Sequence, residues 1–149
     1  MQKELITHSF KDIFQQFYNN DVSLAAKDAG VSLQQIRNWN SQNRDFYKLA
    51  DGRFLLKTVR ITIFSPKIDL AITGYGEVNN FLILDFIEKI FFDSRIAAAS
   101  AAGISLFQLN NMICQHPDKE VVKTETGHFF ALHSKCVILN MEHISNVVV

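Results

Sequence analysis

The sequence predicts a mainly α-helical protein with small β-hairpins, an α+β fold, arranged as two tandem units that arose by internal duplication. An eleven-residue stretch, "AGVSLQQIRNW" at 29–39, recurs as "AGISLFQLNNM" at 102–112. Each copy follows helix-forming segments and precedes a segment rich in β-forming residues around a glycine. We expect the first unit at residues 1–64, a linker at 65–79 and the second unit at 80–149.

The repeat extends beyond these eleven residues. At an offset of 73, segments 22–39 and 95–112 are identical at eight of eighteen positions, which indicates duplication. Upstream, Phe10, Ile13, Phe14 and Phe17 have the spacing of an amphipathic helix and align with Ile83, Phe86, Ile87 and Ile90. In the second segment we also expect a helical stripe formed by Phe81, Leu84, Ile87 and Phe91.

Two helices joined by a tight turn are predicted in each copy, at about 22–28 and 33–41 and again at about 95–101 and 106–114. Gly30 and Gly103 end the first helix of each pair, because glycine tolerates the left-handed conformation needed there. Ser32 and Ser105 then stand at the N-cap of the next helix. Small side chains (Ala26, Ala99) allow the helices to cross closely, and aliphatic ones (Ile36, Leu109) point into the core.

A β-hairpin is predicted directly after each helix pair, in "DFYKLADGRFLLKTVRITI" and "DKEVVKTETGHFFALHSKCVIL". With these features the chain resembles the winged helix-turn-helix proteins, duplicated in tandem, over roughly 8–64 and 80–140. "SLAAKDAGVSLQQIRNW" also resembles the helix-turn-helix of phage and transposon DNA-binding proteins, including small terminase subunits. The resemblance implies that the third helix of a unit enters the major groove of DNA and that the hairpin, the wing, contacts backbone or minor groove.

The resemblance implies that the first unit binds double-stranded DNA. The third-helix face would consist of Ser32, Gln34, Gln35, Arg37, Asn38 and Ser41, which are residue types that pair with base edges or phosphates. Phosphate contacts would come from Arg44, Lys48, Arg53, Lys57 and Arg60, with Arg53 at the wing tip. Although the whole chain has no net charge, residues 37–67 hold seven Lys and Arg against two Asp.

The second copy has a different face, Ser105, Phe107, Gln108, Asn110 and Asn111, followed by Cys114. Phe107 replaces Gln34, and Asn110 replaces Arg37. An exposed Phe without nearby positive charge is more typical of protein contact than of phosphate contact. The second unit therefore binds a second DNA half-site, a partner protein, a second copy of the chain or the first unit, and the sequence leaves these alternatives open.

Three functions fit the sequence: a DNA-binding transcriptional regulator, a protein-binding adaptor or inhibitor on a winged-helix scaffold, and a phage or mobile-element accessory protein for DNA packaging or recombination. No nucleophile elbow, paired acidic motif or phosphate loop is recognisable, and "TGYGE" lacks the Lys and Ser/Thr of such a loop, so we expect no enzymatic activity. We expect no metal or cofactor either, because His128 and Cys136 on one strand would lie about 27 Å apart. The start of the sequence has no signal-peptide core, and no apolar run is long enough to span a membrane. We expect a cytoplasmic protein of a bacterial cell or phage-infected host.

Overall fold

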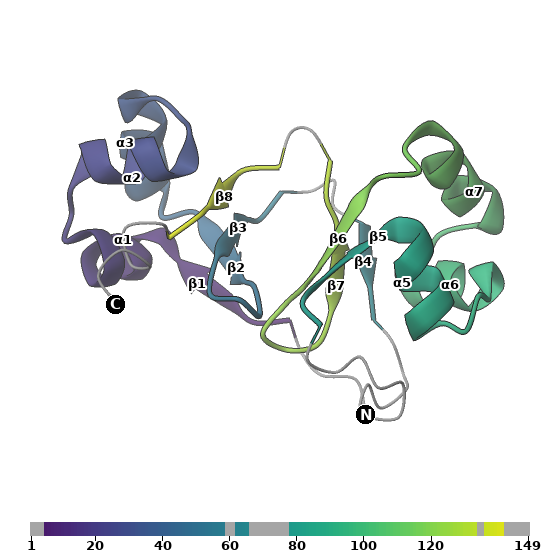
Figure 1. The fold of residues 1–149 in the computed structure, drawn as a ribbon. Helices are drawn as coiled ribbons and strands as arrows, with labels where there is room; N and C mark the ends of the chain where they lie inside the picture. The colour runs from purple at the N-terminus through teal and green to yellow at the C-terminus, as the bar shows by residue number, and fades with distance from the viewer. Residues whose placement is uncertain (1–4, 59–61, 66–77, 134–135, 142–149) are drawn as a thin grey trace. The chain divides into compact units, whose positions relative to one another are not determined.

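The computed structural model describes residues 5–58, 62–65, 78–133 and 136–141 (Figure 1). These residues form an α+β fold with six helices and two antiparallel four-stranded sheets. The chain divides into two compact units that are not consecutive halves of the sequence. The first unit contains residues 6–58 and 136–141, and the second contains residue 5 together with 62–65 and 78–133.

In the first unit, three helices precede a β-hairpin. The elements are β1 (Thr7–Ser9), α1 (Phe10–Tyr18), α2 (Val22–Ala29), α3 (Leu33–Gln42), β2 (Asp45–Lys48), β3 (Phe54–Leu56) and β8 (Ile138–Leu139). The strand order in the sheet is β1-β2-β3-β8. Phe46 lies opposite Leu56, and Phe54 lies opposite Leu139.

The second unit repeats this order. Its elements are β4 (Thr62–Phe64), β5 (Asn80–Leu82), α5 (Ile83–Ile90), α6 (Arg95–Ala102), α7 (Leu106–Gln115), β6 (Glu120–Lys123) and β7 (Phe129–Ala131), and its strand order is β4-β7-β6-β5. The first strand and all three helices start 73 residues after their counterparts in the first unit. The offset found in the sequence therefore holds for the elements of secondary structure.

The outer strand next to each hairpin comes from the other half of the sequence. β4 follows the first hairpin along the chain but pairs with β7, and β8 follows the second hairpin but pairs with β3. The sequence-based division assigns Thr62–Phe64 to the first unit and Ile138–Leu139 to the second, and the structure assigns each strand to the opposite unit. Of the predicted linker, residues 66–77 lie outside the described part of the chain.

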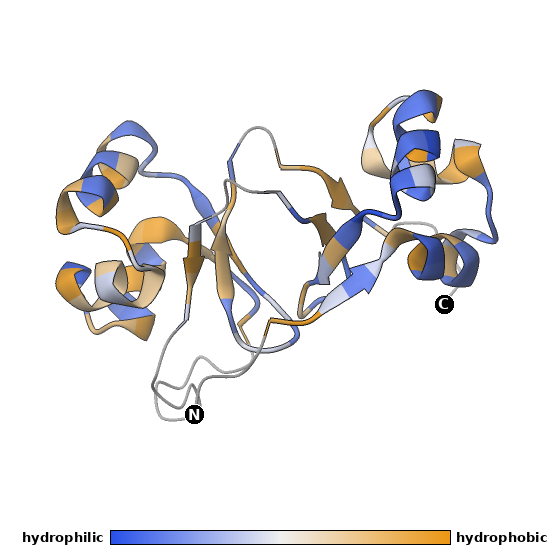
Figure 2. Cartoon of the chain, turned by 180° about the vertical axis from the view of Figure 1, so that it is seen from behind, coloured by the Kyte–Doolittle hydropathy of each residue, from blue (hydrophilic) through white to orange (hydrophobic). Residues whose placement is uncertain are grey.

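Each unit has its own apolar core between its helices and its sheet. In the first, residues of α1, α2 and α3 (Phe10, Ile13, Phe14, Ala26, Ile36, Trp39) pack with Phe54 and with Leu139 of β8. In the second, the corresponding residues pack with Phe129 and with Phe64 of β4. Both colours of the hydropathy scale occur on every helix in Figure 2, as expected for amphipathic helices with one buried face.

The helical stripe predicted for the second unit from Phe81, Leu84, Ile87 and Phe91 is wrong. Phe81 lies in β5, before the helix begins, and Leu84 is 44% exposed. The buried face of α5 consists of Ile83, Phe86, Ile87 and Ile90. The first three align with buried residues of α1, and Ile90 aligns with the half-buried Phe17. An apolar segment allows more than one stripe with helical spacing, and the start of the helix after β5 decides which one faces the core.

A buried carboxylate anchors the segment after β8 to the first unit. Asp28, at the end of α2, accepts hydrogen bonds from the Tyr18 hydroxyl and from the Met141 backbone N–H, the latter at 2.9 Å. The Asn140 side chain donates to the Asp28 carbonyl oxygen at 2.9 Å. Burial, with the hydrogen bond to Asp28 and its charge, raises the pKa of Tyr18 well above its ordinary value.

Candidate nucleic-acid interface

The turn between α2 and α3 forms as the sequence predicts. Gly30 ends α2 in the left-handed conformation, with φ 68°. Ser32 and Gln35 then form a capping box at the start of α3: the Ser32 hydroxyl accepts from the Gln35 N–H at 3.2 Å, and the Gln35 side chain accepts from the Ser32 N–H at 3.1 Å. Ile36 and Trp39 are buried, so these contacts fix which side of α3 faces outward.

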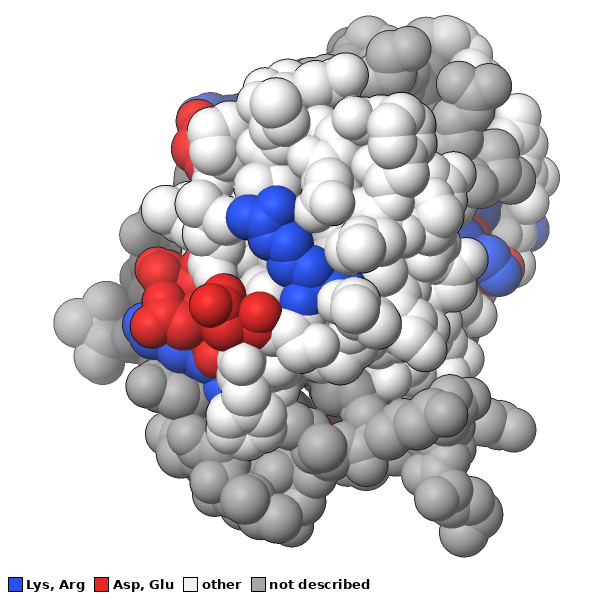
Figure 3. All heavy atoms as spheres, turned by 90° about the vertical axis from the view of Figure 1, so that its right-hand side faces the viewer, with Lys and Arg blue, Asp and Glu red and all other residues white. Residues whose placement is uncertain are grey.

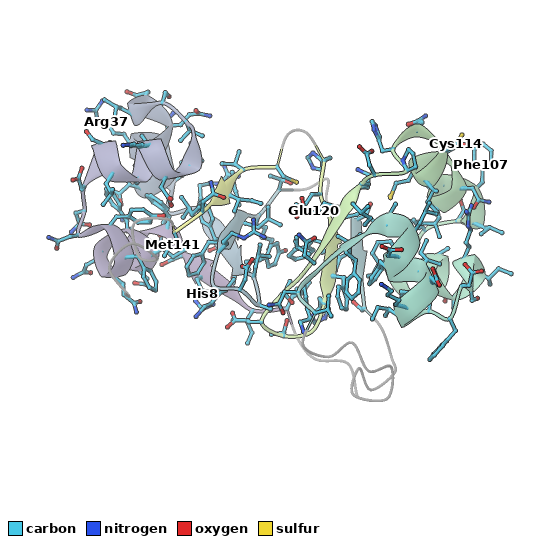
Figure 4. The ribbon with its side chains drawn as sticks, in the orientation of Figure 1. His8, Arg37, Phe107, Cys114, Glu120 and Met141 are labelled. Atoms are coloured by element: carbon cyan, nitrogen blue, oxygen red, sulfur yellow. The ribbon has the colours of Figure 1, made fainter. Side chains whose placement is uncertain are left out.

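All six residues predicted to form the outer face of α3 are exposed: Ser32, Gln34, Gln35, Arg37, Asn38 and Ser41. Most of them also bond within α3. The Gln34 amide donates to Asn38 at 3.0 Å, and the Ser41 hydroxyl donates to the Asn38 carbonyl at 3.1 Å. Arg37, labelled in Figure 4, contributes the positive charge of this face.

The cations predicted to contact phosphates differ in their surroundings. Lys57 is exposed, whereas Lys48 and Arg44 are half-buried. The Arg44 guanidinium donates to the Lys57 carbonyl oxygen at 3.2 Å, which joins the end of α3 to the residue after β3. Arg60 lies outside the described residues.

The β2–β3 hairpin closes with a tight turn at Gly52, which has a φ of 97°. The Leu49 N–H donates to the Arg53 carbonyl at 2.7 Å, as in a three-residue hairpin loop with its glycine in the left-handed region. Arg53 stands at this turn, where the sequence places it, but its Nε lies 2.8 Å from a carboxylate oxygen of Asp51. To contact a phosphate, the Arg53 guanidinium must break its ion pair with Asp51 or bind the phosphate and Asp51 at the same time.

The net charges of the two units have opposite signs. The described residues of the first unit hold seven Lys and Arg against five Asp, and those of the second hold four against six Asp and Glu. In the first unit one of the five carboxylates, Asp28, is buried, and another, Asp51, is paired with Arg53. The first unit is therefore the more favourable one for a polyanion.

The face predicted on α7 is also exposed, except that Asn110 is half-buried among Ser105, Phe107, Gln108, Asn110 and Asn111. The Arg95 guanidinium donates to the Asn110 amide oxygen at 2.9 Å, a contact that the sequence does not reveal. Phe107 is 73% exposed, and Figure 4 shows Phe107 and Cys114 on the outer side of α7. The sequence analysis missed Phe92 and Ile96, which are 68% and 71% exposed; comparing the copies at the 73-residue offset would have found both.

An open groove of about 520 Å³ lies elsewhere in the second unit, along β5, α5 and the start of β6. Asp85, Asp118 and Glu120 line it together with Lys89, so its charge disfavours DNA. In the described part of the chain, no three His, Cys, Asp or Glu side chains are grouped closely enough to hold a metal ion. β7 ends at Ala131, so His128 and Cys136 do not share the strand assumed from the sequence.

Of the helices that the structure describes, none is long and apolar enough to cross a membrane by itself; α6 and α7 meet the length and composition requirement only as a pair, across a bend of 104°. Comparison of the chain with protein-family models, with curated proteins and with solved structures finds no match.

Proposed function

We propose that the chain is a DNA-binding protein built from two winged helix-turn-helix units that arose by duplication, and that the first unit binds duplex DNA through α3 and the β2–β3 hairpin. It would act as a transcriptional regulator or as an accessory factor of a phage or mobile element. The observation that carries the proposal is the outer face of α3, which is exposed and polar and includes the positive charge of Arg37. On the opposite side of the helix, Ile36 and Trp39 are buried in the core.

The scaffold supports this proposal. In both units two short helices meet at a left-handed glycine, and a capping box starts the second helix. The bend of 104° between α6 and α7 lies within the range of about 90–120° found in helix-turn-helix motifs. A hairpin follows the third helix in each unit, which is the place of the wing in winged-helix proteins.

The side chains suggest separate roles. Arg37 is suited to pair bidentately with guanine, and the amides of Gln34 and Asn38 to pair with adenine once their mutual hydrogen bond opens. Lys57, with Lys48 and Arg44, would neutralise phosphates beside the groove. The Arg53–Asp51 ion pair makes the wing tip a weaker contributor than the sequence predicts.

The test is DNA binding by fluorescence anisotropy at two salt concentrations, with duplexes selected from a randomised pool. We expect affinity to fall as salt rises, with a log–log slope of about 0.9 per phosphate contact. Arg37→Ala should weaken binding to the selected sequence by about 5- to 150-fold and relax its sequence preference. Lys11→Ala is the matched control, because it removes one positive charge from an exposed position on α1.

The alternative is a protein-binding adaptor or inhibitor on the same scaffold, favoured by the exposed Phe107. The same experiment separates the two functions. If the wild-type chain binds no duplex even at low salt, or if Arg37→Ala and Lys11→Ala behave alike, the DNA-binding proposal is refuted. An apolar protein interface would not weaken steeply with salt.

A further inference from the structure

The second unit exposes large apolar side chains at positions where the first unit is polar. Phe107 is 73%, Ile96 is 71% and Phe92 is 68% exposed, and Leu106 is 41% exposed. We call these four residues the outer face of the second unit. At the 73-residue offset, the first three correspond to Gln34, Ser23 and Asn19. The fold itself therefore does not require apolar residues at these three positions.

Phe92 and Ile96 lie at the start of α6, and Leu106 and Phe107 at the start of α7. The hydrogen bond from Arg95 to Asn110, at 2.9 Å, joins the first turn of α6 to the middle of α7. Ile96 is next to Arg95, and Phe107 lies one helical turn before Asn110. Phe92 comes two residues before Ser94, the N-cap of α6. The outer face is therefore built from the start of both helices.

Phe92 is not only exposed but also has an unfavourable backbone conformation. Its φ is 53°, in the left-handed region, where bulky residues are rare and Asn is enriched. The first unit has Asn19 at this position, with a φ of 50°. Residues held in strained backbone conformations cluster at functional sites.

The outer face carries little charge. Between Ser94 and Pro117 the chain has a single charged residue, Arg95, and its guanidinium already donates to Asn110. The exposed carboxylate of Asp93, next to Phe92, is the other charge beside this face. The equivalent stretch of the first unit, residues 21–44, contains three Lys and Arg and two Asp. Figure 3 shows this end of the second unit as a mostly white surface with a blue patch near its centre and a red patch beside it at the lower left. A surface with so little charge is poorly suited to phosphates, and two copies of it do not repel each other.

The exposed apolar area of the outer face is large enough for a homodimer interface. Aromatic side chains present about 150–250 Å² each, so the two Phe residues with Ile96 and Leu106 expose roughly 500 Å². A standard interface buries about 800 Å² per partner, and about 65% of a homodimer interface is apolar, which again gives roughly 500 Å². We propose that a second copy of the chain binds this outer face, so that the two faces pack on each other across a two-fold axis. This inference does not rest on DNA binding.

The test measures the mass of the full chain by analytical ultracentrifugation, without DNA, up to about 0.5 mM. The decisive variant carries the residues of the first unit, Phe92→Asn, Ile96→Ser and Phe107→Gln. These residues already occur in the equivalent fold, and Asn suits the left-handed backbone, so the variant should fold. Leu84→Gln is the control, because Leu84 is an exposed apolar residue of α5 outside the outer face.

We expect the wild type and Leu84→Gln to form dimers, and the triple variant to dissociate at least about 100-fold more readily. Circular dichroism should show the helix content of the triple variant unchanged. A wild-type chain that stays monomeric at every concentration overturns the inference, as does a folded triple variant that still dimerises like the wild type. Binding of some other protein or of duplex DNA to this face, with a monomeric wild type, also counts against it.

Discussion

Replacing Leu139 with Ala tests the exchange of strands between the two halves of the sequence. Leu139 lies near the end of the chain, in β8, but it is fully buried in the core of the first unit and faces Phe54. Deleting the buried atoms of a Leu side chain lowers the free energy of unfolding by about 2–5 kcal/mol. The loss should fall on the first unit, more than 80 residues earlier in the sequence.

The single Trp of the chain gives a direct assay. Trp39 is buried in the same core as Leu139, so its fluorescence reports unfolding of the first unit. For a loss of about 3 kcal/mol and an m-value of about 1.5 kcal/mol/M, the urea midpoint should fall by about 2 M. Amide hydrogen exchange should also speed up in β2 and β3 more than in β6 and β7.

Phe64→Ala is the reciprocal variant. Phe64 is fully buried in the core of the second unit, although it follows the first hairpin in the sequence. It should accelerate exchange in β7 and move the Trp39 transition less than Leu139→Ala does. The reasoning is refuted if Leu139→Ala leaves the Trp39 transition unchanged and speeds exchange in β6 and β7 instead, because each strand would then belong to the half of the sequence that contains it.

Three further predictions concern individual residues. Because the folded-state pKa of Tyr18 is raised above its unfolded value of about 10, its contribution to stability is present below pH 10 and is lost as pH rises further. Tyr18→Phe should therefore reduce the alkaline loss of unfolding free energy by up to about 1.4 kcal/mol per pH unit, measured by urea unfolding above pH 10; an unchanged slope would contradict this. Gly30→Ala should lower the free energy of unfolding by about 1 kcal/mol through backbone strain alone, since a Cβ there meets no atom within 4 Å, and a stabilised variant would refute the left-handed turn. Ser105→Ala should cost about 1 kcal/mol in thermal unfolding by removing the cap of α7, and Ser105→Asp, which keeps an acceptor, should restore most of it.

Local features of the fold could be predicted from the sequence. The ends of the helices at Gly30 and Gly103, and the caps at Ser32 and Ser105, depend on the chemistry of one or two residues. The exposed side of α3 follows from helical periodicity once Ile36 is placed in the core. These features require no knowledge of which distant segments meet.

The strand exchange could not be predicted, because it depends on pairing between distant segments. Thr62–Phe64 and Ile138–Leu139 are both short and mainly apolar, and either could complete either sheet by its pattern. The sequence around Leu139 does not indicate that this residue pairs with Phe54. For the candidate site, the Ser-x-x-Gln spacing is typical of a capping box, but from the sequence Gln35 is assigned to the DNA-binding face alone. The ion pair of Arg53 with Asp51 depends on the hairpin geometry.

The two copies differ at the surface and agree in the core, and this separates the two proposals experimentally. Ala26 and Ala99, like Ile36 and Leu109, are buried and interchangeable in size, because packing restricts them. The exposed positions have no such restriction, so one copy could retain a polar face while the other became apolar. If both proposals hold, a dimer presents two α3 helices, and a duplex with two half-sites should bind more tightly than one with a single half-site. The triple variant on the outer face should then lose only this gain, while Arg37→Ala should weaken binding to both duplexes and leave the dimer intact.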